Sequence, residues 1–427
     1  MIFEQGLDFL AQLDLTGFLT VFWFWALFDL PRYVLDIVPI TATAIFSAFA
    51  RRFSRDFNRP GYKGPVSIVL AGHNEARVLR QSVIGLRDQT HKDIQIIVVS
   101  DGSTDGMERV AQGLLKEGLI DVALSTPLRA GKSAAVNLGI RFCDHPVIVN
   151  MDIDTSLDRD AIEMLIRPFA DPKVGGVAGN IGVRNVDESL LTRLQAIEYL
   201  ESIALGRRFT SMANILPIVS GGYGAFRKSA LTQVGDMSVG PGEDADVTDK
   251  LRRAGWEVRF AHRSWALTDA PVNLDGFVRQ RLRWDRDILR LRLRKFGNNL
   301  NPFSRRFSLA NALEILNILI FEVVLTFAVL TYLAWIFIGY GELAPILLAM
   351  VTSFYLVEDI VEYMMVCILY PERNPGRLWP YIVGASIFRG YVMPAIRFVA
   401  LVDDMMFRSS YRDSYVPQRV LNQATRF

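Results

Sequence analysis

Hydrophobic residues in the middle of the chain fall into short, nearly unbroken runs that alternate with stretches of helical spacing. The apolar runs are Val66–Ala71, Ile94–Ser100, Ile120–Leu124 and Val147–Met151, and the helical stretches are Val78–Asp88, Met107–Lys116 and Ser133–Phe142. Strands that are apolar throughout indicate a parallel sheet covered by helices on both faces. We therefore predict an α/β fold with a doubly wound, mostly parallel sheet, in which a ligand would bind beyond the carboxyl ends of the strands.

Two apolar runs near the start of the chain predict membrane association. Leu15–Phe28 and Tyr33–Ala50 are each short for a membrane crossing, which needs about 20 residues. Together they predict a tight two-helix hairpin that turns at Pro31, which we prefer, or one crossing helix preceded by an interfacial helix. A basic cluster follows at Arg51, Arg52 and Arg55. Such clusters stay on the cytosolic side of a membrane, so the segment after it is expected in the cytosol.

The C-terminal part contains the longest apolar stretches. Leu309–Ile338 and Leu343–Tyr370 are long enough to cross a bilayer, whereas Tyr381–Val402 stays undecided because it contains Arg389 and Arg397. Charges are costly inside a bilayer, so the carboxylates of these stretches should line a polar path or pair with those two arginines. These carboxylates are Glu314, Glu322, Glu358, Asp359 and Glu362.

Arginines crowd the segment Gly276–Lys295, just before the apolar stretches. We predict a helix there that either rests on an anionic membrane surface or carries a solvated charged face. The chain then divides into five parts. They are an N-terminal transmembrane part (1–56), a cytosolic domain (57–272), an interface helix region (273–306), C-terminal transmembrane helices (307–402) and a polar tail (403–427).

Composition narrows the classes of protein that remain. Of 427 residues, 51% are hydrophobic and the formal net charge is only +2, so no basic bias suggests nucleic acid as a partner. Cys143 and Cys367 lie far apart, and the four histidines lack metal-ligand spacing, which argues against a disulfide framework or a zinc site. No Gly-x-Gly-x-x-Gly follows the first strand, which disfavours a dinucleotide oxidoreductase.

Two carboxylates follow the predicted strand Val147–Met151. Asp152 and Asp154 are two positions apart, and on an extended segment such side chains point the same way. Hard oxygen ligands without a histidine or thiol favour Mg²⁺ or Mn²⁺, which can bridge two phosphates and neutralise a leaving diphosphate. The sequence therefore predicts a metal held by Asp154 and Asp152, with an acidic turn at a strand end as the ordinary alternative.

Polar residues end the first two strands and open the third helical stretch. Asp101 follows the second strand, where its carboxylate can accept the N–H of a uracil ring or cap a helix. His73 and Glu75 follow the first strand and offer polar groups to a base and a ribose. Lys132 begins a helix, a position that suits contact with a diphosphate.

Two further motifs lie in the second half of the domain. Glu243 and Asp244 open a helix, where one carboxylate can act as a general base toward a sugar hydroxyl or simply stabilise the helix end. Gly222 and Tyr223 belong to a glycine-rich segment that suits a sugar face or a turn between strands.

A last motif lies on the predicted arginine-rich helix. Gln280, Arg283 and Trp284 share one helical face. An amide, a guanidinium and an indole together can bind a diphosphate and stack on a sugar ring. A core tryptophan flanked by surface arginines is the ordinary alternative.

Each motif has an ordinary explanation on its own, but their order within Val66 to Trp284 resembles that of family 2 glycosyltransferases. This group holds cellulose, chitin, hyaluronan and poly-N-acetylglucosamine synthases. Gln-x-x-Arg-Trp in a membrane-tethered chain is the most specific part and is characteristic of the polymerising branch. The resemblance implies a nucleotide-sugar-binding α/β domain flanked by transmembrane helices at the cell inner (plasma) membrane, multi-pass, with the catalytic domain in the cytosol.

The resemblance also implies roles for the residues named above. Glu75 and Asp101 would hold uridine, and Asp152 and Asp154 the donor and its metal. Asp244 would be the catalytic base of the Glu243–Asp244 pair, and Gln280, Arg283 and Trp284 would close over diphosphate and acceptor. Gly242 stands where many relatives have threonine, and Ala-Gly-His-Asn-Glu stands where Pro-x-Tyr-Asn-Glu is frequent. These departures leave every carboxylate in place but put the identity of the acceptor in doubt.

The function implied is an inverting hexosyltransferase that moves N-acetylglucosamine, or glucose, from a UDP-sugar to a growing β-linked polysaccharide. One alternative is a non-processive transferase that adds a single sugar to a lipid acceptor. Another is an inactive membrane scaffold, which loss of a motif carboxylate would signal. The expected partners are the donor, a glycan or lipid-linked acceptor and the bilayer, with an accessory membrane subunit as a further candidate.

Overall fold

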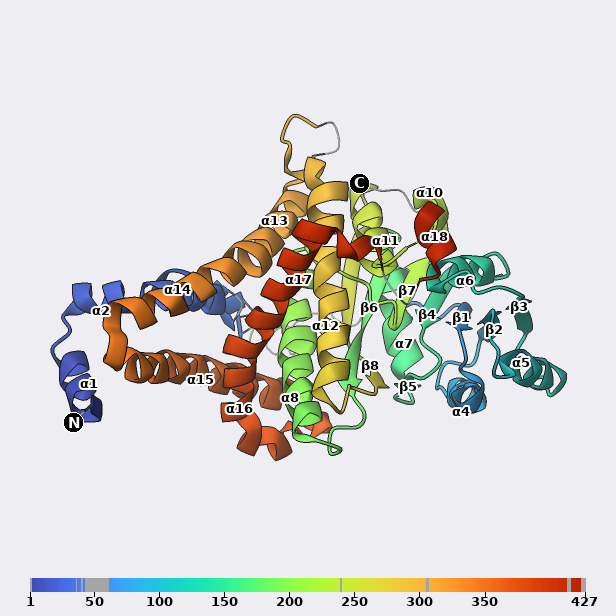
Figure 1. Cartoon of the computed structure of the whole chain (residues 1–427). Coiled ribbons are helices and arrows are strands. Elements are labelled where there is room, and N and C mark those ends of the chain that lie inside the picture. The colour runs from blue at the N-terminus through green and yellow to red at the C-terminus, as the bar shows by residue number, and fades with distance from the viewer. Residues whose placement is uncertain are drawn as a thin grey trace.

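A computed structural model describes residues 2–35, 37–39, 41–42, 61–238, 240–304, 307–412 and 416–423. The predicted basic cluster at Arg51, Arg52 and Arg55 lies outside these residues. The catalytic-domain candidate forms the right half of Figure 1, and long helices extend from it to the left.

One eight-stranded sheet organises this domain, in the order β3-β2-β1-β4-β7-β6-β8-β5. β3, β2, β1 and β4 run parallel, whereas β7 runs antiparallel to both β4 and β6, and β5 antiparallel to β8. The strands are β1 (Val66–Gly72), β2 (Ile94–Asp101), β3 (Val122–Thr126), β4 (Val147–Met151), β5 (Ser156–Leu157), β6 (Val174–Val183), β7 (Tyr223–Arg227) and β8 (Glu257–Thr268). The prediction of a mostly parallel α/β sheet is confirmed.

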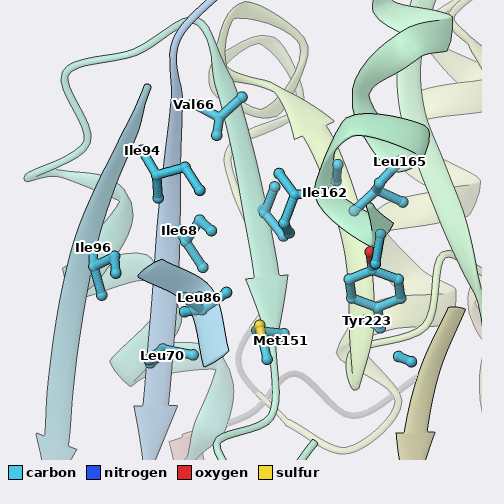
Figure 2. Packing of buried hydrophobic residues seen from close by; sticks show 14 of the residues in the cluster. Val66, Ile68, Leu70, Leu86, Ile94, Ile96, Met151, Ile162, Leu165 and Tyr223 are labelled. Carbon is cyan, nitrogen blue, oxygen red and sulfur yellow. The ribbon is translucent and has the colours of Figure 1, made fainter. Parts of the chain in front are cut away.

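Side chains of alternate strand residues pack on opposite faces of the sheet, which helices cover on both sides. Val66, Ile68 and Leu70 contact the first group of helices, and Figure 2 shows Leu86 between Ile68 and Leu70 of β1. Val69 and Ala71 face the second group. The first group is α4 (Ala76–Arg87), α5 (Met107–Lys116) and α7 (Ala161–Ile166), and the second is α6 (Lys132–Ile140), α10 (Lys228–Val234) and α11 (Glu243–Arg253).

In the first half of the domain, the predicted helices and strands agree closely with those of the structure. The bounds of α5 and β4 are those expected, while β3 begins at Val122 instead of Ile120. The remaining elements of the domain and its edge are η3 (Arg167–Ala170), α8 (Leu190–Tyr199), η4 (Leu200–Gly206), α9 (Arg207–Met212), α12 (Leu274–Ile288), η5 (Leu289–Lys295) and η6 (Gly297–Leu300).

Among the described residues, two helical stretches are long and apolar enough to cross a membrane, Leu309–Leu369 and Pro375–Phe407. The first turns back on itself at η8 (Gly341–Leu343), so that α13 and α14 run outward in Figure 1 and α15 returns. The second includes the stretch left undecided by the sequence. The elements are α13 (Leu309–Ile318), η7 (Leu319–Val324), α14 (Leu325–Tyr340), α15 (Ala344–Leu369), η9 (Pro371–Arg373), η10 (Pro375–Tyr381), α16 (Ile382–Ile387), η11 (Phe388–Val392), α17 (Met393–Phe407), η12 (Ser409–Tyr411) and α18 (Gln418–Gln423).

The N-terminal segment bends earlier than predicted. It comprises α1 (Ile2–Ala11), α2 (Leu15–Val21) and η1 (Trp25–Asp29), and Leu15–Val21 and Trp25–Pro39 meet at 88°. A hairpin turn at Pro31 is wrong, because the chain is helical on both sides of that residue. The π-helical turn η1 contains Leu27, whose carbonyl a proline four residues later would crowd in a regular α-helix. The bent pair counts as a third span if it crosses as one unit.

The arginines of the predicted interface helix are not all at a surface. Arg290 and Arg292 are buried, and Arg292 pairs with Asp249 of α11 and Glu314 of α13. For these two residues both expectations, an anionic lipid surface and a solvated face, are wrong. A helix wedged between a domain and membrane helices buries arginines when carboxylates on both sides compensate them.

The carboxylates of the apolar stretches mostly pair with arginines. Glu201 of η4, Asp359 and Glu362 surround Arg389, a group that we call the carboxylate cluster. Glu322 lies 4.0 Å from Arg397. Glu358 instead accepts a hydrogen bond from Trp25 Nε1 at 2.8 Å.

Candidate active site

The loops that follow β1 and β2 are joined by hydrogen bonds at the carboxyl edge of the sheet. The Asn74 N–H donates to Ser103 Oγ at 3.1 Å, and the Thr104 N–H donates to Asn74 Oδ1 at 2.8 Å. Asn74 adopts a positive φ of 62°, which asparagine tolerates better than most residues. His73 donates from Nδ1 to the Asp101 carbonyl at 2.8 Å, so His73 and the end of β2 lie side by side.

Asp101, at the end of β2, positions the loop that leads to Lys132. Its Oδ1 accepts the Ala130 N–H at 2.6 Å and its Oδ2 accepts the Gly131 N–H at 2.7 Å. The carboxylate is buried and therefore orders the chain's own backbone. Its predicted contact with a uracil ring stays a prediction.

Lys132 begins α6 and reaches across to Asp152 at the end of β4. Its Nζ lies 2.5 Å from Asp152 Oδ1. Burial by itself would lower the pKa of Lys132, but the nearby carboxylates of Asp152, Glu243 and Asp244 outweigh burial and raise it to about 12. The ammonium is therefore a permanent positive charge among three of the predicted site carboxylates.

The glycines Gly221 and Gly222 lie where these groups meet. The Gly221 N–H donates to Asp244 Oδ2 at 3.0 Å, and the Asp152 N–H donates to the Gly222 carbonyl at 3.0 Å. A Cβ on Gly221 would lie 3.4 Å from Lys132, Glu243 and Asp244 side-chain atoms alike. Predicted residues from α6, β4 and α11 therefore converge at one point beyond the carboxyl ends of the strands.

Glu243 and Asp244 begin α11 after Gly242, which has a positive φ of 65°. Burial first, and then the like charge of Asp244, raise the pKa of Glu243 to about 7. Asp244 is held in place because its Oδ1 also accepts the Ala245 N–H at 2.8 Å. The pair thus combines a fixed carboxylate with one that titrates near neutral pH.

Acidic groups also gather around Asp154. Burial and then the charge of Asp152 raise the pKa of Asp154, and burial followed by Asp154, Asp152 and Asp105 raises the pKa of Glu75. These carboxylates offer the hard oxygen atoms that a divalent cation prefers as ligands, although the described acids whose oxygens all lie within 4.8 Å of one another are Glu201, Asp359 and Glu362. The predicted ligands Asp152 and Asp154 are thus suited to Mg²⁺ or Mn²⁺.

Tyr223 does not belong to the site. Its ring is wholly buried beside Leu165 in the sheet core, as Figure 2 shows, and its hydroxyl shares a 2.7 Å hydrogen bond with Ser264. The prediction that it contacts a sugar is wrong. Because Tyr223 begins β7, strand alternation directs its side chain into the core, and only Gly222 before it faces Asp152.

Gln280, Arg283 and Trp284 lie on α12, as predicted. The Trp284 indole is 41% exposed, and the Arg281 guanidinium lies 4.7 Å from its ring centre. Gln280 Oε1 is buried and has no hydrogen-bond partner among the described residues. Asp287, four residues after Arg283 on the same helical face, lies 3.1 Å from the Cβ position of Gly242. That face of α12 therefore leads directly to the start of α11.

Sequence reasoning missed Arg207, which enters from α9. Its Nη1 donates to Ser220 Oγ at 3.0 Å, next to Gly221. Burial lowers the pKa of Arg207 to about 10, although Asp244 opposes this effect. Arg207 follows a π-helical segment and carries no motif, so no spacing signal marked it.

The C-terminal segment also reaches the site and was missed. Val416 and Pro417 lie 3.8 Å and 3.7 Å from the Cβ position of Gly131. Arg419 donates to the Arg129 carbonyl. Figure 1 shows α18 beside α6, so the polar tail packs on the loop before Lys132.

Comparison with known proteins agrees with this geometry. Residues 67–235 match the family model described as Glycosyl transferase family 2. Poly-beta-1,6-N-acetyl-D-glucosamine synthase of Staphylococcus aureus (strain COL) is 29% identical over 249 residues, covering 57% of this chain and 59% of the synthase. The Staphylococcus epidermidis synthase is 30% identical over 243 residues, covering 55% and 57%.

A solved structure shares the fold. It is the mannosyltransferase PcManGT from Pyrobaculum calidifontis in complex with GDP-Man and Mn²⁺, with a TM-score of 0.55 at 18% identity, covering 84% of this chain and 99% of that one. The fold and the family match together define a glycosyltransferase domain, and its candidate site lies at the carboxyl edge of the mostly parallel sheet. Residues 67–235 therefore match family 2 glycosyltransferases, and the chain is similar to the poly-beta-1,6-N-acetyl-D-glucosamine synthases over a somewhat longer stretch. It spans less than two thirds of the length of the curated relatives that it matches.

Proposed function

We propose that this chain is an inverting hexosyltransferase that transfers sugar from a UDP-sugar to a growing β-linked polysaccharide at the membrane. The convergence of Lys132, Asp152, Glu243 and Asp244 around Gly221–Gly222 carries the proposal. N-acetylglucosamine is the first candidate sugar, because the matched relatives are named for it, and glucose is the second. The domain would face the cytosol from a multi-pass chain in the cell inner (plasma) membrane.

Some of the site residues would bind the donor, and others would act on the acceptor. Asp152 and Asp154 would hold Mg²⁺ or Mn²⁺, which stabilises the charge of the leaving diphosphate. Lys132 contacts the same diphosphate, while Glu75, His73 and Asp101 flank the uridine. Asp244 accepts the proton of the attacking acceptor hydroxyl as the bond between the sugar and the diphosphate breaks. One such displacement inverts the anomeric carbon.

Gln280, Arg283 and Trp284 would hold the acceptor end at the diphosphate. The exposed Trp284 indole suits stacking on a sugar ring. A chain that stays bound between additions needs such a platform, and this supports polymerisation over a single transfer to lipid.

The base assignment is tested with Asp244→Asn in the full-length protein in lipid nanodiscs. Turnover should fall about 10²–10⁴-fold, the usual contribution of general-base catalysis, with UDP-sugar affinity kept. Retained turnover in Asp244→Asn together with loss in Glu243→Gln would transfer the role to Glu243. EDTA and Asp154→Asn should both abolish transfer, and full activity in metal-free buffer contradicts the metal assignment.

The product distinguishes the two kinds of transferase. Radiolabelled UDP-N-acetylglucosamine and UDP-glucose are incubated separately with the protein, and the products are separated by size. A ladder that shortens in Trp284→Ala at normal protein abundance supports polymerisation. A single sugar on a lipid, with no ladder at any donor concentration, identifies the non-processive transferase.

Topology is tested with Lys63→Cys, an exposed position before β1. A membrane-impermeant maleimide should label it only after the cells are permeabilised, since nucleotide sugars are cytosolic. The parent protein, with Cys143 and Cys367, is the control for background labelling. Labelling in intact cells reverses the orientation.

A further inference from the structure

Four buried charged side chains form a closed ring between the domain and the first C-terminal membrane helix. Arg252 contacts Asp249 Oδ1 at 2.5 Å and Glu314 Oε2 at 3.0 Å. Arg292 contacts the other oxygen of each acid, Asp249 Oδ2 at 2.8 Å and Glu314 Oε1 at 3.1 Å. All four are buried, and the two positive and two negative charges balance. We call this group the charge ring.

The charge ring joins two helices that carry the site to a helix of the apolar C-terminal part. Asp249 and Arg252 lie on α11, which begins with Glu243 and Asp244. Arg292 lies on η5, which continues the α12 helix that bears Trp284. Glu314 lies on α13, at the start of a stretch long and apolar enough to cross a membrane.

The same arginines also hold the segment that leads to Gly221. Arg252 donates to the Leu216 carbonyl at 3.2 Å, and Arg292 donates to the Pro217 carbonyl at 2.9 Å. Two residues on, the Val219 N–H donates to Thr248 Oγ1 of α11 at 2.8 Å. The backbone that presents Gly221 to Asp244 is therefore held by the ring at its start and by α11 along its length.

We infer that Glu314 is a positioning residue. It acts through the charge ring to hold Asp244, Gly221 and the helix of Trp284 in the positions that catalysis requires. Without Glu314 the ring would carry an excess positive charge, and α11 would lose its ion pair with α13. Asp249 lies five residues, about 7–8 Å of helix, from Asp244, so a small rotation of α11 displaces the base. A displacement of about 1 Å can lower turnover on the order of 100-fold.

Glu314→Gln tests the inference, which rests on the proposed sugar transfer. It keeps the shape of the side chain and removes the charge. We expect kcat to fall on the order of 100-fold, with donor KM within about twofold of the parent, since Asp101, Asp152 and Lys132 lie outside the ring. Glu314→Asp, which restores the charge, should recover part of kcat. Glu342→Gln, an exposed acid at the turn between α14 and α15, is the matched control and should change neither constant.

A second variant separates positioning from folding. Arg292→Met with Glu314→Leu removes one charge of each sign and leaves the Asp249–Arg252 pair balanced, so thermal stability should recover relative to Glu314→Gln. A low kcat in this stable double variant supports positioning, whereas kcat that recovers with stability overturns it. Normal kcat in Glu314→Gln overturns it as well. If the parent and Glu342→Gln transfer no sugar from any donor, the proposed function fails instead.

Discussion

Two charge groups, one buried and one partly exposed, join the domain to its long apolar helices, and they differ in their charge balance. The charge ring has two arginines for two carboxylates, whereas the carboxylate cluster has one arginine, Arg389, for three. Both groups contain buried carboxylate oxygens without a hydrogen-bond partner among the described residues, on Glu201 and Asp359 in the cluster and on Glu314 in the ring, so the two groups differ in their count of charges. A balanced group can hold its geometry at any physiological pH, while an unbalanced one favours uptake of protons.

Because of this difference, we expect different roles for the charge ring and the carboxylate cluster, which are the two joints between the domain and the apolar helices. The ring meets α11 and α12, which carry the proposed base and acceptor platform, and there a fixed geometry matters. The cluster meets η4 at Glu201, six residues before Arg207, and burial raises the pKa of Glu201 well above its ordinary value. The first joint is expected to be rigid and the second to respond to pH.

The largest effect should follow from unbalancing the ring. Arg292→Met leaves Asp249 and Glu314 with one guanidinium between them, and breaking a buried ion pair in this way costs about 3–5 kcal/mol. Denaturant unfolding of the purified protein in detergent measures the loss. A loss below about 1 kcal/mol would mean that the ring is not the rigid joint described here.

The second effect is a pH dependence of stability to which the carboxylate cluster contributes through Glu201. Because folding raises the pKa of Glu201, its protonated form favours the folded state, and stability should decline as pH rises from about 4.5 through the raised pKa. One proton gives a slope of at most about 1.4 kcal/mol per pH unit. Glu201→Gln should reduce this slope, while Glu342→Gln, at an exposed acid, should leave it in place. Equal slopes in the parent and Glu201→Gln would contradict the distinction between the joints.

A third effect concerns the site that the rigid joint supports. Glu243 has a pKa of about 7, so its carboxylate form is lost as pH falls through that value. If the anionic pair is needed, kcat/KM should fall up to about tenfold per pH unit below pH 7. The pH–rate profile with saturating metal measures this limb, and a flat profile between roughly pH 6 and 8 contradicts it.

The smallest effect is expected at an exposed pair. Arg80 and Glu117 contact each other at 2.8 Å on the surface, between α4 and the end of α5. Water and salt screen such a pair, so Arg80→Met should leave the unfolding midpoint unchanged within error. A shift as large as that of Arg292→Met would show that burial does not explain the effect of the ring.

The local sequence determined the strands and their helices, and it named most of the candidate site residues. Unbroken apolar runs placed β1, β2 and β4 correctly, because strand patterning is local. Motifs at strand ends located Asp101, Asp152 and Lys132, since the carboxyl ends of parallel strands share one edge. The same motifs also indicated carboxylates for a divalent ion and a lysine for a diphosphate.

Only the tertiary structure decided which charges meet. The Tyr223 side chain points into the core because β7 lies antiparallel between β4 and β6. No local sequence pattern predicts this pairing. Arg207, Arg292 and Glu314 come from segments far apart in sequence, and a buried charge is defined by what packs around it, not by its neighbours along the chain. The sequence could therefore name the chemistry of the site, while the packing of α11, η5 and α13 determined what holds that chemistry in place.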